Sequence, residues 1–386
     1  MARSPRTHLV TGATGFIGAA LVLELLSSDP DCLVVCLVRE SKHAGAGERL
    51  RSALTTAARL YGSTTSAADL RLRARAVVGD VTRPRCGVST GEVGPVDELW
   101  HCAASLDYRE THSDEIMRQN LTGTEHVLEL LQAVGGPTLN HFSTAYVAGS
   151  RTGEIAEEPA LDRGVANNAY ERSKIAAEQL VAQAGVTVRI MRPSIVIGHS
   201  VTCATTGFSG VYGFIEDLAR LKAEVSMRLG DFLKHRAIRS RAHADAELNL
   251  VPVDVVARTA VALGAASAPG AVYHLTNATP PTIDDIVRVV CQELGVRPFE
   301  LGASPQEFTT IDEQFDSDQR MAFFRSYITV QRSFDQSNVR RVLGAPACAD
   351  PLQKRWREYV RWYLHSRDTT RDHRGARKYR IFPTSS

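Results

Sequence analysis

The sequence predicts an α/β fold, a Rossmann-type doubly wound parallel sheet with a smaller, mostly helical C-terminal substrate lobe. Two observations support this prediction. Short β-branched runs alternate with amphipathic runs over the first 200 residues, which is typical of parallel strands covered by helices on both faces. A glycine-rich segment from Gly12 to Gly18 follows the first run and opens the first helix, as at the first strand–helix junction of dinucleotide-binding folds.

The elements of this half are expected in regular succession. Each strand is a short apolar, β-branched run, and each helix repeats apolar residues at helical spacing. Residues 64–69 are expected to form a surface loop. We expect strands at residues 8–11, 32–39, 75–79, 98–103, 138–143 and 186–191, and helices at 16–28, 48–61, 113–133 and 169–184.

The pattern changes after Gly198, where a stretch rich in Gly, Ser and Thr begins. Beyond it we expect helices at 214–225, 250–264, 283–294 and 350–366 and a strand at 272–275. The predicted dinucleotide-binding domain comprises residues 1–200, with 250–279 returning to it. The predicted substrate lobe comprises 201–249 and 280–366, and a flexible basic tail without apolar periodicity covers 367–386.

Composition narrows the functional classes. The chain has 386 residues and 44% hydrophobic composition, enough for a large core. A net charge of +2 provides no strong field for nucleic acid, and no apolar stretch reaches the ~18 residues needed for membrane insertion. The seven cysteines are scattered without a C-x-x-C pair, so we expect no metal site and a reducing, cytoplasmic location.

The glycine segment is the first candidate site. Glycines at a strand–helix turn let the backbone approach a pyrophosphate, and the helix N-terminus donates N–H groups to its negative charge. The spacing here is G-x-x-G-x-x-G, and the alternative is a turn that only packs the helix on the strand. The residues expected to bind the cofactor are Gly12, Thr14, Gly15, Phe16, Ile17 and Gly18.

The end of the second strand indicates which dinucleotide is bound. An acidic residue there favours NAD, whereas Arg39 can hold a 2′-phosphate in its guanidinium fork. Lys42 and Arg49 add positive charge, so we expect NADPH to be preferred over NADH. The alternative is that Arg39 lies in solvent while Glu40 binds the ribose. Asp80, just past the third strand, is expected either to contact adenine or to cap its own turn.

Tyr170 and Lys174 lie four residues apart on an expected helix and therefore share one face. A free tyrosine has a pKa of about 10, and a nearby ammonium favours the phenolate and lowers that pKa. The pair is thus suited to exchanging a proton with an alkoxide that forms from a carbonyl. The alternative is a surface tyrosine beside a solvated lysine.

A hydroxyl upstream completes this candidate catalytic set. Thr144 follows the strand at 138–143, where it can hydrogen-bond a substrate carbonyl on which negative charge develops. Ser143 is the neighbouring alternative. Asn120, in the preceding long helix, is expected either to support a proton-relay water or to bond the backbone as a polar core residue.

These motifs together resemble the extended short-chain dehydrogenase/reductase family. Several segments also resemble its thioester-reductase and fatty acyl-CoA reductase branch. The similarity is good over residues 7–275 and looser beyond. The segments are Cys36-Leu37-Val38-Arg39, His101-Cys102-Ala103-Ala104, His141 to Val147, Arg192-Pro193-Ser194 and Asn249 to Asp254.

The resemblance implies catalytic roles for Thr144, Tyr170 and Lys174, with Lys174 also bonding the nicotinamide ribose, and a nicotinamide-binding loop from Pro193 to Ile195. It implies reduction of an acyl thioester, carried on an acyl carrier protein or coenzyme A, to an aldehyde or alcohol. The chain departs from multidomain members because it has no carrier-domain serine motif and no adenylation region. It also lacks the apolar C-terminal segments of membrane-associated relatives.

Some alternatives remain open at this stage. The same residues suit a dehydrogenase or epimerase of a nucleotide sugar or a small hydroxy or keto compound, and the fold also suits a non-catalytic nucleotide sensor. The insertion 208–246 is basic, and it either faces a phosphopantetheine or acidic carrier or forms a solvated surface. Its cations are Lys222, Arg228, Lys234, Arg236, Arg239 and Arg241.

Overall fold

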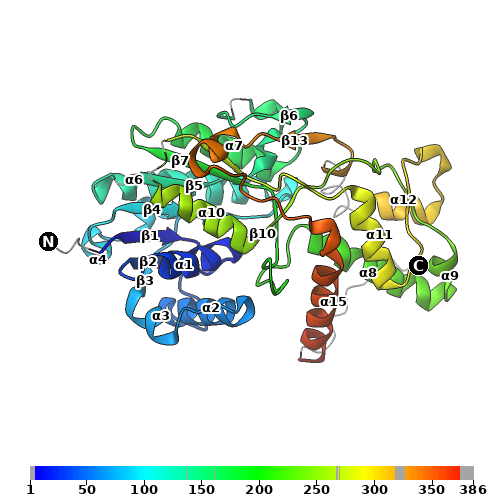
Figure 1. Cartoon of the computed structure of the whole chain (residues 1–386), viewed down its shortest axis with the longest axis horizontal. Coiled ribbons are helices and arrows are strands. Elements are labelled where there is room, and N and C mark those ends of the chain that lie inside the picture. The colour runs from blue at the N-terminus through cyan, green and yellow to red at the C-terminus, as the bar shows by residue number, and fades with distance from the viewer. Residues whose placement is uncertain are drawn as a thin grey trace.

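The computed structural model describes residues 5–136, 138–160, 162–266, 268, 270–317 and 327–373. Its centre is a seven-stranded sheet in the order β11-β7-β5-β4-β1-β2-β3, with every neighbouring pair parallel. This confirms the doubly wound α/β fold (Figure 1). The strands are β1 (Thr7–Thr11), β2 (Leu33–Val38), β3 (Ala74–Val78), β4 (Glu98–His101), β5 (Thr138–Phe142), β7 (Val188–Pro193) and β11 (Val272–Leu275).

Two hydrophobic clusters cover the two faces of this sheet. Val10 packs with side chains of α1, α2 and α10, whereas its neighbour Leu9 packs with side chains of α6 and α7. Successive side chains of a strand point to opposite faces, so the sheet is sandwiched between two helical layers. The helices are α1 (Phe16–Ser28), α2 (Ala46–Tyr61), α6 (Gly123–Ala133), α7 (Ala169–Val181) and α10 (Val253–Ala265).

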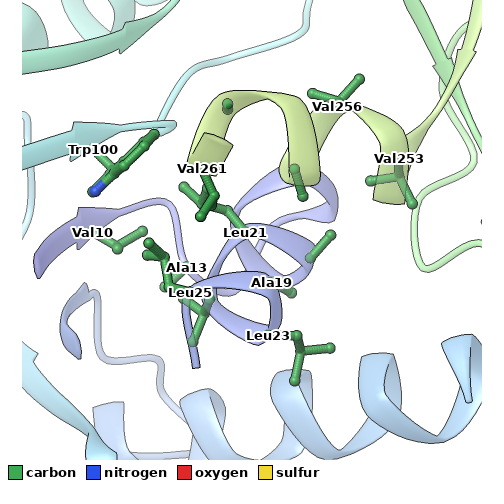
Figure 2. Close-up of a cluster of buried hydrophobic side chains, with 14 of the residues drawn as sticks. Val10, Ala13, Ala19, Leu21, Leu23, Leu25, Trp100, Val253, Val256 and Val261 are labelled. Atoms are coloured by element: carbon green, nitrogen blue, oxygen red, sulfur yellow. The ribbon is translucent and has the colours of Figure 1, made fainter. Parts of the chain in front are cut away.

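Helix α1 is anchored on both sides, as Figure 2 shows. It lies between α10 and α2, and its Leu21 shares a buried cluster with Val261 of α10 and Trp100 of β4. The start of α1, next to the glycine turn, is therefore held in one position relative to the sheet. The strand order reverses between β1 and β4, which is where open α/β sheets bind ligands beyond the carboxyl ends of their strands.

The long helix expected at 113–133 contains a π-helical turn. It consists of α5 (Ser113–Met117), the π turn Arg118–Thr122 and α6. Asn120 lies within the π turn, and its carbonyl oxygen accepts a hydrogen bond of 2.6 Å from the Thr124 hydroxyl. Such a turn inserts one residue into a helix and is frequent at functional sites.

Two local expectations were wrong. Residues 64–69 include the start of α3 (Ala67–Arg73), because Ser66 and Asp69 form a reciprocal capping box with bonds of 3.0 and 3.2 Å. Residues 250–264 do not form one helix. They begin with strand β10 (Leu250–Pro252), which pairs with β8 (Ile195–Ile197), and α10 starts only after Pro252.

The lobe at the right of Figure 1 packs around a second large hydrophobic cluster, which also includes Tyr146, Ile155 and Ile197 from the first 200 residues. Trp356 is fully buried there and donates a hydrogen bond of 3.2 Å to the carbonyl oxygen of Ile286. The last helix continues beyond the expected end at Ser366, and the rest of the predicted tail, 374–386, lies outside the described residues. The elements are α8 (Val211–Leu229), α9 (Phe232–His235), β9 (Arg239–Ser240), α11 (Ile283–Leu294), β12 (Glu300–Leu301), α12 (Thr310–Ser317) and α15 (Trp356–His373).

One segment within 280–366 returns to the large sheet. Strand β13 (Arg332–Phe334) pairs with β6 (Gly153–Ile155). Helix α14 (Ser337–Leu343) follows, and Asn338 donates a 3.0 Å hydrogen bond to the carbonyl oxygen of Val272 in β11. The C-terminal part of the chain is thus tied to the sheet edge nearest the lobe. A short helix, α4 (Thr90–Val93), lies between β3 and β4 in the chain.

Candidate active site

The glycine turn after β1 is packed so closely that two of its glycines have no room for a side chain. Gly12 has a φ of +72°, and a Cβ there would lie 2.7 Å from the amide nitrogen of Ala103. A Cβ on Gly18 would lie 2.1 Å from the carbonyl oxygen of Gly12. The turn, α1 and the loop after β4 can therefore meet only through bare backbone.

Helix α1 begins beside this turn with exposed backbone. Gly15 is its N-cap, is exposed, and has no side chain to bond the first N–H groups. Such N–H groups attract phosphate. Thr14, Phe16 and Ile17 lie partly exposed around them. Packing by itself accounts for Gly12 and Gly18, and at the exposed position 15 an added Cβ would lie 3.2 Å from the carbonyl oxygen of Gly12, a tighter contact than most side chains make.

Arg39 follows β2 at the same edge of the sheet, where both it and Glu40 are exposed. The guanidinium of Arg49, on α2, donates a hydrogen bond to the carbonyl oxygen of Arg39. A cavity of about 430 Å³ between α1 and α2 reaches from Thr14 to Arg49. The open space thus lies between the glycine turn and Arg49, and the hydrogen bond from Arg49 connects it to the end of β2.

Asp80 closes the turn after β3. Its Oδ1 accepts hydrogen bonds of 2.9 Å from both the N–H and the hydroxyl of Thr82. Burial raises the pKa of Asp80, but the Thr82 hydrogen bonds and the charges of Arg39 and Arg83 outweigh it and bring the pKa below its ordinary value. These contacts are those of a turn cap, and contact with adenine stays a prediction.

Thr144 and Tyr170 meet at the carboxyl end of β5. Their side chains lie close enough for Thr144 to lower the pKa of Tyr170, and Thr144 Oγ1 accepts a hydrogen bond of 3.2 Å from the Tyr146 N–H. The Ser143 hydroxyl is buried without a partner among the residues that the structure describes. Of the two hydroxyls considered from the sequence, Thr144 is therefore the one that contacts Tyr170.

Lys174 lies one helical turn after Tyr170 and is 4% exposed. Its Nζ donates a hydrogen bond of 2.6 Å to the carbonyl oxygen of Phe142, the last residue of β5. Burial lowers the pKa of Lys174 to about 8, and the negative charge of Glu178 opposes that decrease. The structure therefore brings Thr144, Tyr170 and Lys174 to one strand end.

The pKa of the tyrosine differs from expectation. Burial raises the pKa of Tyr170 and the charge of Glu171 raises it further, while the hydrogen bond with Thr144 lowers it. The prediction that Lys174 brings this pKa below its ordinary value was wrong for this structure, because burial prevails and the ammonium bonds Phe142. The phenol is thus neutral near neutral pH, which is the form that can donate a proton.

Asn120 bonds the backbone and a helix residue. Its Oδ1 accepts from the Ser105 N–H at 2.7 Å, and its Nδ2 donates to the Ser105 carbonyl at 3.1 Å and to the Ser173 hydroxyl at 2.8 Å. Ser173 in turn donates to the carbonyl oxygen of Tyr170 at 2.7 Å. This is the polar core alternative, and it ties the loop after β4 to the start of α7.

Pro193 and Ile195 lie at the same edge of the sheet. Pro193 ends β7 and Ile195 begins β8, so that Ser194 alone separates the two strands. The Ile195 N–H donates a 3.2 Å hydrogen bond to the carbonyl oxygen of Asn249. Because β7 neighbours β5 in the sheet, this loop lies beside the strand end that precedes Thr144. Contact with a nicotinamide stays a prediction.

The basic insertion is largely neutralised by partners within the lobe, which differs from the solvated surface that was the alternative, and contact with a phosphopantetheine or an acidic carrier stays a prediction. Arg236 illustrates this, because its partner Asp312 is fully buried. The ion pairs are Arg236–Asp312 at 2.5 Å, Lys234–Asp231 at 2.8 Å, Arg239–Glu300 at 2.9 Å and Arg241–Asp316, and Lys222 donates to the Leu294 carbonyl oxygen at 2.6 Å.

Sequence reasoning missed two groups next to the candidate catalytic residues. Glu171 is buried directly after Tyr170 and accepts a 2.8 Å hydrogen bond from the hydroxyl of Tyr327. Nothing local indicates that contact, since 156 positions separate the two residues. Glu178 is buried one turn after Lys174 and binds Arg192. The four-residue spacing from Lys174 was a usable signal for Glu178.

The described ranges contain no group of three or more His, Cys, Asp or Glu side chains placed to hold a metal ion. No helix in those ranges combines the length and the apolar composition that crossing a membrane requires.

Comparison with known proteins gives matches in sequence. The family described as male sterility protein matches residues 10–260. A linear gramicidin synthase of Brevibacillus parabrevis is 28% identical over 81% of this chain, which spans 6% of that relative. Fatty acyl-CoA reductase 1 of Xenopus laevis is 28% identical over 66% of this chain, which spans 53% of that relative. The chain thus spans about half or less of these relatives.

Solved structures match over nearly the whole chain. The terminal R domain from the myxalamid PKS-NRPS biosynthetic pathway has a TM-score of 0.75 and 25% identity, covering 95% of this chain and 93% of that one. A thiolation-reductase di-domain from an archaeal non-ribosomal peptide synthetase has a TM-score of 0.71 at 21% identity, covering 94% and 91%. The match includes the lobe as well as the large sheet.

Replacing Thr144 by valine is expected to lower kcat by about 100-fold or more, because a hydroxyl that bonds a developing negative charge is lost at constant shape. The matched control is Ser143→Ala, which removes a buried hydroxyl without a partner in the described part of the chain. Steady-state rates with a carbonyl substrate measure both. Equal losses in the two variants, or a larger loss for Ser143→Ala, would contradict the assignment of Thr144.

Proposed function

The chain belongs to the male sterility protein family of extended short-chain dehydrogenases/reductases, and from this premise we propose that it is an NADPH-dependent reductase of acyl thioesters. The observation on which the proposal rests is the set of Thr144, Tyr170 and Lys174 at the end of β5, on the same sheet edge as the glycine turn. The likeness to R domains over both the sheet and the lobe supports the choice of a thioester.

The proposed chemistry is a two-electron reduction. NADPH, when bound, would supply a hydride to the thioester carbonyl carbon and become NADP⁺. The C–S bond breaks, the leaving thiol takes the proton delivered during reduction, and the products are an aldehyde and a free thiol. Thr144 and Tyr170 direct their hydroxyls at the carbonyl oxygen and orient it. A hydrogen-bond donor at this position is worth most as negative charge develops on that oxygen.

Tyr170 serves as the proton donor in this scheme. Burial raises the pKa of its phenol, so the proton is present near neutral pH and can pass to the oxygen during reduction. Lys174, with its ammonium held at the carbonyl of Phe142, bonds the nicotinamide ribose. The raised pKa supports operation in the reductive direction.

We propose that the exposed N–H groups at the start of α1 bind the pyrophosphate and that Arg39 binds the 2′-phosphate. Gly12, Thr14, Gly15, Phe16, Ile17 and Gly18 form the pyrophosphate cradle, Asp80 lies at the adenine, and Pro193 and Ile195 lie at the nicotinamide. The cavity that reaches from Thr14 to Arg49 supports the proposal that a phosphate binds between α1 and α2.

Arg39→Ala is expected to raise KM for NADPH by at least about tenfold and to leave KM for NADH unchanged. The loss corresponds to a charge-assisted hydrogen bond of about 1.5–3 kcal/mol. Arg59→Ala, at an exposed position in the last turn of α2, serves as the control for surface charge. An unchanged preference in Arg39→Ala would favour Glu40 as the ribose ligand.

We propose that residues 1–200 with 250–279 bind the dinucleotide and that the lobe binds the acyl group, the lobe being 201–249 with 280–366 apart from β13 and α14, which return to the large sheet. Both a carrier protein and coenzyme A present the thioester on a phosphopantetheine arm, and we propose that the protein recognises that arm. All seven cysteines are unpaired, which supports a reducing, cytoplasmic location.

The test is a substrate panel monitored by nicotinamide absorbance. Purified protein with NADPH is offered acyl-CoA thioesters, the same acyl groups on a carrier protein, ketones and nucleotide sugars. We expect NADPH oxidation with stoichiometric release of free thiol from one of the thioester arms. Turnover of a nucleotide sugar or ketone without thioester reduction would overturn the proposal.

A further inference from the structure

A buried ion pair lies one helical turn after Lys174 on α7. Arg192, on β7, binds Glu178, on α7, through both carboxylate oxygens, at 2.9 Å from Nε and 2.6 Å from Nη2. Both side chains are 1% exposed. The Arg192 Nη2 also donates to the carbonyl oxygen of Glu158 at 2.8 Å. Such a bidentate pair holds the carboxylate in one orientation.

Glu178 lies one helical turn after Lys174, on the same face of α7. The other ionisable side chains that interact with Lys174 are His101, His141 and Cys102. Burial lowers the pKa of His101 to about 3 and that of His141 well below its ordinary value, and it raises the pKa of the Cys102 thiol.

These three neighbours are therefore uncharged near neutral pH. The phenol of Tyr170, one helical turn before Lys174, is neutral as well. Among the described residues, Glu178 is the one carboxylate that acts on the Lys174 ammonium. A buried ammonium is costly without such a partner.

We propose that Glu178, held by Arg192, is a positioning residue that keeps Lys174 charged and directed at the end of β5. The inference rests on the proposed function, because it concerns the lysine of that catalytic set. Glu178 acts through Lys174 and touches neither substrate nor cofactor. Arg192 contributes by orienting the carboxylate.

The chain offers a matched control on the same strand. Arg189 binds Glu98 at 3.0 Å in a second buried Arg–Glu pair. Positions 189 and 192 of β7 point to opposite faces of the sheet, and Arg189 bonds the carbonyl oxygen of Ala268 at 2.7 Å. Glu98→Gln therefore breaks a comparable buried pair on the face away from Lys174.

The experiment compares Glu178→Gln with Glu98→Gln in cofactor-free protein. The chain contains six lysines, so isotope-labelled lysine gives an NMR titration in which Lys174 is assigned by its loss in Lys174→Ala. We expect the pKa of Lys174 to fall by about one unit or more in Glu178→Gln and to stay unchanged in Glu98→Gln. Thermal unfolding reports how much each variant is destabilised.

The direction of the activity change follows from the sign of this shift. The ammonium predominates below the pKa of Lys174, about 8, and is lost above it. Removing Glu178 moves that loss to lower pH, so the alkaline limb of kcat is expected to shift to lower pH by the same amount. An unmoved Lys174 titration in Glu178→Gln, or an equal shift in Glu98→Gln, would overturn the proposal.

A second variant covers the case in which Glu178→Gln does not fold. The double substitution Glu178→Gln with Arg192→Gln removes the carboxylate without leaving the Arg192 guanidinium unpaired, and it is also expected to lower the Lys174 pKa. Full activity of Lys174→Ala would overturn the catalytic role of the lysine, and with it the proposed function. The NMR titration still measures the coupling between Glu178 and Lys174 in that case, so the two failures are distinguishable.

Discussion

Replacing Tyr170 by phenylalanine is expected to lower kcat by about 100-fold or more while NADPH affinity is retained. The substitution removes the one oxygen that donates the proton, a role worth about 10²–10⁴ in rate. The ring still fills its partly buried position on α7, and the glycine turn and Arg39 are untouched. Steady-state kinetics on a thioester substrate and fluorescence titration with NADPH measure the two quantities separately.

The control for this variant removes the same atom from another tyrosine. Tyr359, on α15, has a buried hydroxyl without a partner among the described residues, so Tyr359→Phe is expected to leave both kcat and NADPH affinity unchanged. If Tyr170→Phe kept the activity of the parent protein, the proton donor would have to be another group. Parallel losses in both variants would indicate a general packing effect.

Substituting Gly18 by alanine is expected to abolish measurable NADPH binding and to lower the free energy of unfolding by about 1–3 kcal/mol, the typical cost of overpacking. The new Cβ would lie 2.1 Å from the carbonyl oxygen of Gly12. That atom is backbone, so it cannot rotate away. The turn or the start of α1 must shift, and the N–H groups proposed to bind the pyrophosphate shift with it. Calorimetric titration and denaturant unfolding measure the two effects.

A second glycine-to-alanine change tests whether the effect is specific to the turn. Gly47 lies in the first turn of α2, and the nearest atom to an added Cβ there is the flexible end of Arg51, at 3.9 Å. Gly47→Ala is expected to leave binding intact and to stabilise the protein by up to about 1 kcal/mol. Normal NADPH binding by Gly18→Ala would contradict the proposed pyrophosphate site.

Local sequence patterns were enough to predict most strands of the large sheet and most of the helices that cover it. Helices Phe16–Ser28 and Ile283–Leu294 begin and end where their apolar spacing predicts, because each has a glycine or a capping threonine at its start and a continuous buried stripe. The strands were equally readable, since parallel strands buried on both faces are continuous β-branched runs. Pro252 indicated that the helix begins only after it, and Ser66 with Asp69 indicated the start of another helix. Both signals were overlooked.

The candidate catalytic residues could also be predicted from the sequence, because each lies on one expected helix or just after one expected strand. Tyr170 and Lys174 share a helix face, and Thr144 follows the strand that ends at Phe142. The pKa of Tyr170 was not readable. It depends on how deeply the phenol is buried and on the neighbouring Glu171, and burial is a property of the assembled molecule.

The sequence by itself determined the fold class, the glycine turn and the spacing of the hydroxyl, the tyrosine and the lysine, since these depend on neighbours along the chain. Only the tertiary structure decided that Arg192 holds Glu178 behind Lys174, that Tyr327 reaches Glu171, and that the cations of the insertion meet acidic partners. Most of those contacts join residues on different elements of the chain, such as Tyr327 with Glu171 and Arg236 with Asp312. Their strength depends on removal from water, and only the packed chain excludes water from them.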